Sequence, residues 1–226
     1  MLKPKKASKK EVVYISEVPT KLLRPRNPRQ AAAISSLCNN SITILTGPAG
    51  TGKTYLAASK ALDLLQAGII SQIIITRPYV ASEKMGFLPG EIADKFEPYL
   101  APYIDAFTDR IGKQSLNQML SDGRIQAQPI AFIQGKTFND AMILLDEVEN
   151  ATSEQIKLVL TRLGENSRVC LMGDTDQSYI SNSGFFEAIN ILKSVPRLQV
   201  VEFEICDVVR SETCRHVLEA YARAKV

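Results

Sequence analysis

The chain is poor in the features that define several common classes of protein. Its 226 residues include no tryptophan, a single histidine (His216) and four cysteines. No apolar run approaches the roughly 20 residues of a transmembrane helix, and no apolar stretch follows the basic N-terminus as it would in a secretory signal. The cysteines, at positions 38, 170, 206 and 214, lack metal-ligand spacing. We therefore expect no membrane association, no thiolate metal centre and a cytoplasmic location.

Basic residues are concentrated at the N-terminus. The net charge is +3, but residues 1–30 hold nine Lys and Arg against two Glu, a balance of +7 that leaves −4 for the remainder. An apolar content of 45% is enough for one substantial core. We expect residues 1–25 to form a basic, partly disordered arm and residues 26–226 to form one domain. The lysines of the arm, including Lys5 and Lys6, are typical of a nucleic-acid contact, although a solvated tail has the same composition.

A glycine-rich motif indicates a nucleotide-binding loop. Residues 47–54 read GPAGTGKT, which matches the pattern G-x-x-x-x-G-K-[ST]. A β-branched run at 41–46 precedes the motif and a helix-forming segment at 55–62 follows it, which is the setting that this loop requires. Such a loop turns backbone N–H groups towards phosphate, while its lysine reaches the β- and γ-phosphates and its last hydroxyl holds Mg²⁺. The alternative is a glycine turn beside a lysine. The predicted nucleotide-binding residues are Gly47, Pro48, Ala49, Gly50, Thr51, Gly52, Lys53 and Thr54.

Two adjacent carboxylates supply what hydrolysis of the nucleotide needs. Asp146 and Glu147 follow the apolar run 141–145, which is typical of a strand buried on both faces. Asp146 is placed to bind Mg²⁺ and Glu147 to deprotonate the attacking water, an effect worth about 10²–10⁴ in rate. The pair favours ATP hydrolysis over phosphorylation of a small molecule. The alternative is an acidic cap on the helix that follows.

Other polar residues are candidates for sensing and stabilising the γ-phosphate. Gln177 follows the Gly173–Asp174 turn of a predicted strand, where a polar side chain faces the γ-phosphate. A role in the turn alone is the alternative. Transition-state charge requires an arginine, although each candidate is also typical of an ordinary surface or ion-pair residue. These candidates are Arg77, Arg162 and Arg210.

Helical and strand-like segments alternate along the chain. We expect strands at 72–76, 141–145, 168–172 and 198–204, and extended pieces at 125–128 and 130–133. We expect helices beginning at Asn27–Pro28, running from 92 to 111 with kinks at Pro98 and Pro102, and covering 113–121, 153–163, 184–193 and 212–222. This order predicts an α/β fold, in which a mostly parallel sheet has helices on both faces.

The motifs together resemble the PhoH family of P-loop ATPases over roughly residues 26–224. Beyond the phosphate loop, the resemblance is carried by TRP at 76–78, EKMGFLPG at 83–90, FIQGKTFN at 132–139, LLDE at 144–147, LTRLG at 160–164 and DVVR at 207–210. It implies a single RecA-like P-loop NTPase core, similar to the first motor domain of superfamily 1 helicases, that binds and hydrolyses ATP with Mg²⁺. Some relatives carry an added RNA-cleaving domain, and we expect no counterpart of it here.

The resemblance also implies roles for individual residues. It places Gln30 to read adenine, and Thr76 and Arg77 on a loop that touches single-stranded nucleic acid. It assigns the phosphates, Mg²⁺ and the attacking water to Lys53, Thr54, Asp146 and Glu147. The chain departs from the family pattern at Glu149, Tyr179 and Ser211.

The leading hypothesis is an ATPase coupled to RNA or single-stranded DNA, with a helicase-like or remodelling role. Helicases close two RecA-like lobes on ATP, and this length holds one lobe. We therefore expect a homo-oligomer such as a ring, in which Arg210 or Arg162 completes the ATP site in cis or in trans. One alternative is an ATP-gated nucleic-acid-binding or adaptor protein with little turnover. Another is a small-molecule kinase, for which no acceptor-binding lid is recognisable.

Overall fold

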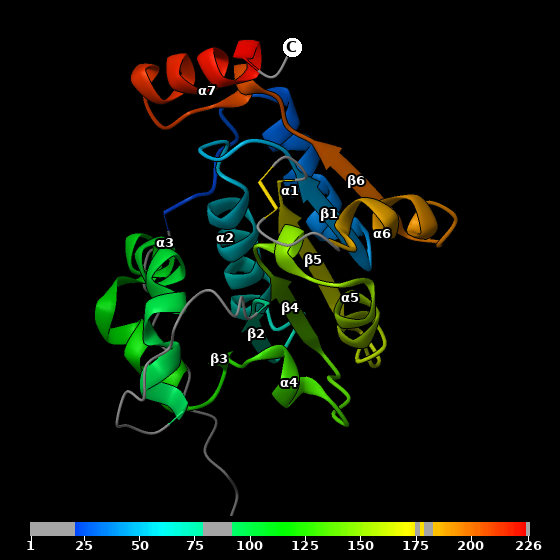
Figure 1. The fold of residues 1–226 in the computed structure, drawn as a ribbon. Helices are drawn as coiled ribbons and strands as arrows, with labels where there is room; N and C mark the ends of the chain where they lie inside the picture. Colours follow the sequence, from blue (N-terminus) through cyan, green and yellow to red (C-terminus); the bar gives the residue numbers. More distant parts are fainter. Residues whose placement is uncertain (1–20, 79–91, 175–176, 179–182, 225–226) are drawn as a thin grey trace, which may run out of the picture.

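The structure is a computed structural model that describes residues 21–78, 92–174, 177–178 and 183–224 (Figure 1). Within these residues the chain forms a six-stranded sheet in the order β3-β2-β4-β5-β1-β6, and every pairing is parallel. The predicted α/β fold is confirmed. The strands are β1 (Ile42–Thr46), β2 (Gln72–Thr76), β3 (Ile125–Ala127), β4 (Ala141–Leu145), β5 (Arg168–Gly173) and β6 (Leu198–Glu202).

Helices cover both faces of the sheet, as predicted, because its central strands are apolar on both sides. One buried cluster joins a first face to α1 (Pro28–Asn39), α2 (Lys53–Gln66) and α3 (Ile92–Ser121). A second cluster joins the other face to α4 (Ile130–Ile133), α5 (Ser153–Leu160) and α6 (Phe185–Leu192).

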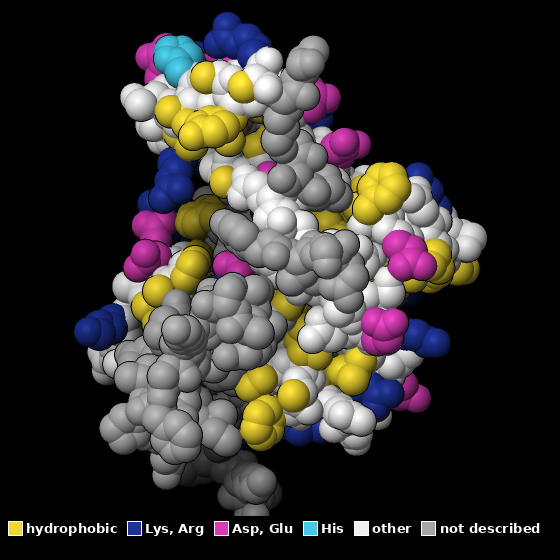
Figure 2. All heavy atoms as spheres, viewed as in Figure 1, with side chains coloured by type: hydrophobic (Ala, Val, Ile, Leu, Met, Phe, Trp, Pro, Cys, Tyr) yellow, Lys and Arg dark blue, Asp and Glu magenta, His cyan; other side chains and the backbone are white. Residues whose placement is uncertain are grey.

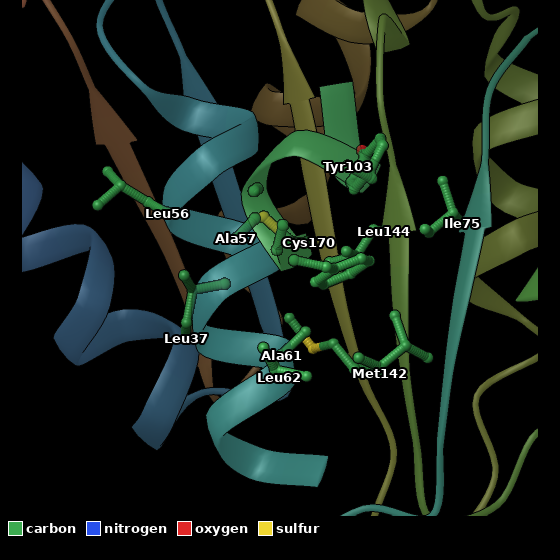
Figure 3. Packing of buried hydrophobic residues seen from close by; sticks show 14 of the residues in the cluster. Leu37, Leu56, Ala57, Ala61, Leu62, Ile75, Tyr103, Met142, Leu144 and Cys170 are labelled. Carbon is green, nitrogen blue, oxygen red and sulfur yellow. The ribbon is translucent and has the colours of Figure 1, made fainter. Parts of the chain in front are cut away.

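Figure 3 shows the first cluster, in which α2 packs against the middle of the sheet. Leu56 and Ala57 of α2 lie in the same buried cluster as Met142 and Leu144 of β4. Cys170 of β5 is also buried there, and the four cysteines of the chain are free. The cysteine therefore acts as a small apolar core residue, as its sequence neighbours indicate.

The last helix, α7 (Glu212–Ala224), lies beyond the carboxyl edge of the sheet (Figure 1). The structure describes all of its residues, and each of them is at least partly exposed. Val217 and Tyr221 are exposed, and Figure 2 shows apolar side chains on the surface of this helix. His216 is exposed on the same helix, and we assign it no chemistry.

Local capping signals set the beginnings of two helices as predicted. The Asn27 side chain accepts the backbone N–H of Gln30 at the start of α1, where Pro28 occupies the first turn. Thr152 and Gln155 form a reciprocal capping box at the start of α5. Each cap satisfies backbone donors that have no partner inside the helix.

One predicted element has the wrong type. Residues 130–133 form a helical turn, α4, rather than an extended piece, because Ile130 and Ile133 are buried three residues apart while Phe132 is exposed. The helical stretches predicted at 92–111 and 113–121 are both present within α3, which stays helical through both prolines and has non-helical dihedral angles at Gly112, with φ of 75°. This left-handed conformation is cheap only for glycine, and it separates the two helical stretches that the sequence predicts.

The sheet topology brings four strand ends together. β2, β4, β5 and β1 are neighbours in that order, and all run in the same direction. They lead respectively into Arg77, Asp146, Asp174 and the loop that begins at Gly47. Residues far apart in sequence therefore meet at the carboxyl edge, where open α/β sheets bind ligands.

Candidate nucleotide-binding and hydrolysis site

The phosphate loop joins β1 to α2, and its three glycines have positive φ angles. These are 127° at Gly47, 82° at Gly50 and 90° at Gly52. A Cβ added at Gly47 would lie 2.3 Å from the carbonyl oxygen of Phe203, which follows β6. The loop is therefore too close to this part of the backbone for any side chain at Gly47. Gly52 caps α2, and the N-terminus of this helix faces the loop as an anion-binding end.

Lys53 folds back over the loop from which it comes. Its ammonium donates hydrogen bonds to the carbonyl oxygens of Gly47, at 2.5 Å, and Pro48, at 2.9 Å. Burial lowers the pKa of Lys53, while the negative charges of Asp174 and Asp146 act in the opposite direction. The lysine is thus held over the phosphate loop by two backbone carbonyls.

Thr54 and Asp146, which are far apart in sequence, are in direct contact. The Thr54 hydroxyl donates to Asp146 Oδ2 at 3.0 Å, and the backbone N–H of Glu147 donates to Asp146 Oδ1 at 3.0 Å. A hydroxyl and a carboxylate at this spacing form the oxygen donor set that Mg²⁺ takes in nucleotide sites. Among the described residues no three His, Cys, Asp or Glu side chains gather into a metal site.

Glu147 begins the 3₁₀ turn η1 (Val148–Asn150) in a left-handed conformation, with φ of 52°. Non-glycine residues rarely adopt this conformation, and they cluster at functional sites when they do. The Glu147 side chain is 43% exposed and forms an ion pair with Arg77, whose Nη1 lies 3.0 Å from Glu147 Oε1. The predicted base is therefore held by the residue that follows β2.

Gln30 connects α1 to the phosphate loop. Its side chain is buried, accepts the backbone N–H of Arg26 at 2.8 Å and donates to the carbonyl of Thr51 at 3.0 Å. A Cβ added at Gly52 would lie 3.3 Å from Gln30 Nε2. The glutamine is thus beside the loop, and both polar atoms of its carboxamide bond to backbone groups.

The site residues surround an open cleft of about 670 Å³, a volume typical of a ligand site. The predicted residues that line it are Ala49, Gly50, Gly52, Lys53, Thr54, Asp146, Glu147, Gln177 and Arg210. Of the three candidate arginines, Arg210 is exposed and packs its Cβ near Gly50. Arg162 lies at the opposite edge of the sheet, where it donates to the carbonyl of Lys136. Within one chain Arg162 therefore does not reach the cleft.

The predicted nucleic-acid residues have different surroundings. Thr76 is buried at the end of β2, whereas Arg77, the next residue, is partly exposed. Of these two residues, Arg77 is therefore the one that a polymer can reach. Lys5 and Lys6, the loop 82–90 and Tyr179 lie outside the described residues.

Sequence reasoning did not assign a role to Glu149, whose side chain is almost fully buried beside the cleft. Its Oε2 accepts the backbone N–H of Asp174 at 3.2 Å, and its carbonyl accepts the Ser178 hydroxyl at 3.0 Å. Glu149 thus connects the turn after β4 to the turn after β5. Burial raises the pKa of Glu149 from 4.5 to about 7, and the nearby charges of Glu147 and Asp146 act in the same direction.

We expect Glu149→Gln to stabilise the nucleotide-free protein at high pH. The pKa of Glu149 is about 7 in the folded chain and 4.5 in the unfolded chain. Between these two pH values the folded chain keeps a proton on Glu149 that the unfolded chain has lost. Unfolding free energy therefore falls as pH rises from about 5 to 7, and the loss is complete above about pH 8. Glutamine keeps an acceptor for Asp174 without a charge. Urea unfolding should show the variant more stable by about 1–3 kcal/mol at pH 8 and nearly unchanged at pH 5. An equal difference at both pH values would contradict this prediction.

Together, the parallel sheet and the arrangement of the phosphate loop, Thr54 and Asp146 define an α/β protein with a RecA-like P-loop NTPase core. Solved structures agree on the fold. The large terminase of a thermophilic bacteriophage superposes with a TM-score of 0.57 at 11% identity, covering 86% of this chain and 49% of the terminase. The same terminase in complex with ATP-γ-S gives a TM-score of 0.53 at 12% identity, covering 88% and 49% of the two chains.

The chain belongs to the PhoH-like protein family, whose sequence profile matches residues 22–222. A PhoH-like protein of Mycobacterium tuberculosis is 41% identical over 207 residues, which are 90% of this chain and 59% of the relative. A PhoH-like protein of Bacillus subtilis is 38% identical over 89% of this chain and 64% of its own length. The chain thus spans about three-fifths of the length of these relatives. No helix in the part of the chain described here is long and apolar enough to cross a bilayer.

Proposed function

We propose that this chain binds ATP with Mg²⁺, hydrolyses it, and couples hydrolysis to single-stranded RNA or DNA in a helicase-like or remodelling role. The main observation in support of the proposal is the hydrogen bond of 3.0 Å between the Thr54 hydroxyl and the Asp146 carboxylate. Both residues line one open cleft together with Lys53 and Glu147. A site for binding alone needs the phosphate loop and a metal ligand. Glu147 adds a base with access to water, which hydrolysis requires.

Each residue of the cleft has a distinct task when the nucleotide is bound. Lys53 exchanges the loop carbonyls for the β- and γ-phosphates, and the loop N–H groups take the remaining phosphate oxygens. Thr54 and Asp146 would hold Mg²⁺, and the ion would supply positive charge against the phosphates. Glu147 orients the attacking water and accepts its proton. Gln177 lines the cleft as a sensor of the γ-phosphate. To read adenine, Gln30 would exchange its bonds with the backbone of Arg26 and Thr51 for bonds with the base.

The ion pair between Arg77 and Glu147 supports coupling to a nucleic acid. Arg77 belongs to the loop that resembles a single-strand contact in helicases, and the same guanidinium holds the catalytic base. A phosphate of a polynucleotide competes with the Glu147 carboxylate for this guanidinium. Binding of the polymer therefore changes the environment of the base. The basic arm, with Lys5 and Lys6, adds electrostatic attraction for the same partner.

We also propose a homo-oligomer such as a ring, in which Arg162 of one copy would act on the ATP site of another. Arg210 lines the cleft from its own chain, whereas Arg162 lies at the opposite edge of the sheet. An arginine in the position of Arg162 contributes to hydrolysis only when a second copy presents it. A ring of identical chains also supplies the second lobe that a helicase closes on ATP.

We expect Arg77→Ala to uncouple ATP hydrolysis from the polymer. Without the guanidinium the Glu147 carboxylate loses the partner that competes with the attacking water, so turnover without polymer should rise about two- to tenfold. Stimulation by poly(U) or poly(dT) should disappear, and Arg77→Lys should be intermediate. The measurement is steady-state ATP hydrolysis with and without each polymer.

Arg124→Ala is the matched control for this experiment. Arg124 is also partly exposed, at 28% against 22% for Arg77, and also pairs with an acid, Asp122, but it lies at the other edge of the sheet. Its replacement should leave basal turnover and stimulation as in the parent. Full stimulation of the Arg77→Ala variant would rule out coupling through this ion pair.

A further inference from the structure

Tyr103 of α3 contacts the candidate metal ligand although no phosphate-loop motif contains it. Its hydroxyl donates to Asp146 Oδ2 at 2.9 Å, and its side chain is 2% exposed. The same oxygen accepts the Thr54 hydroxyl at 3.0 Å, while Asp146 Oδ1 accepts the N–H of Glu147. Both carboxylate oxygens are therefore fixed by donors from three separate parts of the chain.

The tyrosine is itself held rigidly. Its ring lies in the first core cluster with Leu144 and Cys170, as Figure 3 shows. The ring of Phe107, one turn further along α3, packs against it with centroids 6.4 Å apart and planes tilted by 40°. The buried ring therefore holds the hydroxyl in place against the Asp146 carboxylate.

We infer that Tyr103 is a positioning residue that orients the Asp146 carboxylate for Mg²⁺. The inference rests on the proposed function, because it assigns Mg²⁺ to Thr54 and Asp146. Thr54 is itself a proposed ligand of the ion, so its bond to Asp146 would change when the ion binds. Tyr103 is not a proposed ligand, and its bond to Asp146 would remain before and after the ion binds. Outer-shell donors of this kind typically change metal affinity about 10- to 100-fold when they are removed.

Removal of the hydroxyl alone tests this role. In Tyr103→Phe the ring and its packing remain, and the Asp146 carboxylate loses one donor. Binding of a fluorescent ADP analogue is measured as Mg²⁺ is titrated, and again in EDTA. We expect the Mg²⁺ concentration that gives half of the maximal increase in binding of the analogue to rise about tenfold or more. Affinity for the analogue in EDTA should stay within about twofold of the parent, since Tyr103 does not line the nucleotide cleft.

Phe107→Leu is the control for packing. Phe107 is buried in the same helix and cluster, and it makes no contact with Asp146 among the described interactions. This variant should lose stability in urea without a change in Mg²⁺ dependence. An unchanged Mg²⁺ dependence in Tyr103→Phe overturns the positioning role, as does an equal loss of affinity in EDTA. Nucleotide binding by the parent that ignores Mg²⁺ overturns the proposed function and this inference together, which the parent titration alone reveals.

Discussion

Glu147→Gln is expected to reduce ATP turnover by about 10²–10⁴ while nucleotide affinity stays close to that of the parent. Glutamine has nearly the same shape as glutamate but cannot accept the proton of the attacking water. The phosphate loop and the contact of Thr54 with Asp146 do not involve the Glu147 side chain, so the binding half of the site remains. The variant also loses the ion pair with Arg77, which at this exposure contributes at most about 1 kcal/mol to stability.

The experiment pairs single-turnover hydrolysis with equilibrium binding of labelled ATP. Glu165→Gln is the control, because Glu165 is exposed at the opposite edge of the sheet, where Asp140 bonds to its backbone. That control should hydrolyse ATP as the parent does. Turnover of the Glu147→Gln variant within about threefold of the parent would remove Glu147 from the chemistry, since a general base contributes far more than that.

Gly47→Ala is expected to disrupt both the phosphate loop and the stability of the fold. The φ of Gly47 is 127°, which an L side chain rarely adopts, and the new Cβ would lie 2.3 Å from the Phe203 carbonyl oxygen. Neither atom belongs to a flexible side chain, so the loop or the end of β6 has to move. We expect a loss of about 2–4 kcal/mol in unfolding free energy. We also expect affinity for ATP to fall at least about tenfold, because the N–H groups of the loop are displaced from the phosphate.

Gly68→Ala separates steric contact from backbone strain. Gly68 also has a positive φ, of 68°, but a Cβ there would meet nothing within 4 Å. Its replacement should cost only the left-handed penalty, about 1–2 kcal/mol, with no effect on ATP affinity. Urea unfolding and binding of a fluorescent ATP analogue measure the two effects. If both variants lose the same stability and bind ATP equally, the close approach of Gly47 to Phe203 has no role.

The sequence predicts the parts of the site that depend on local pattern and strand direction. The phosphate loop is a contiguous motif between a strand and a helix, so its glycines and Lys53 can be placed without tertiary information. Asp146 follows a buried strand, and all parallel strands of one sheet end at the same edge. Its contact with Thr54 follows from these two facts. The α/β fold is predictable for the same reason.

Other contacts depend on how helices and turns pack, which local pattern does not specify. Tyr103 reaches Asp146 because α3 packs beside α2, and an apolar helix with a tyrosine is typical of any core. The ion pair of Arg77 with Glu147 depends on the left-handed turn at Glu147, a conformation that non-glycine residues rarely adopt. The prediction of an extended piece at 130–133 is wrong because a run of four apolar residues fits a strand and a helix equally well.

The most direct test of the account is steady-state hydrolysis of ATP with Mg²⁺, without polymer and with single-stranded RNA or DNA, at low and moderate salt. We predict turnover that depends on Mg²⁺ and that at least one of the polymers stimulates. Stimulation should weaken as salt rises, because contacts with the phosphate backbone release counterions. Tight binding of ATP without turnover, with either polymer or with none, would contradict the account and leave a nucleotide-gated binding protein in its place.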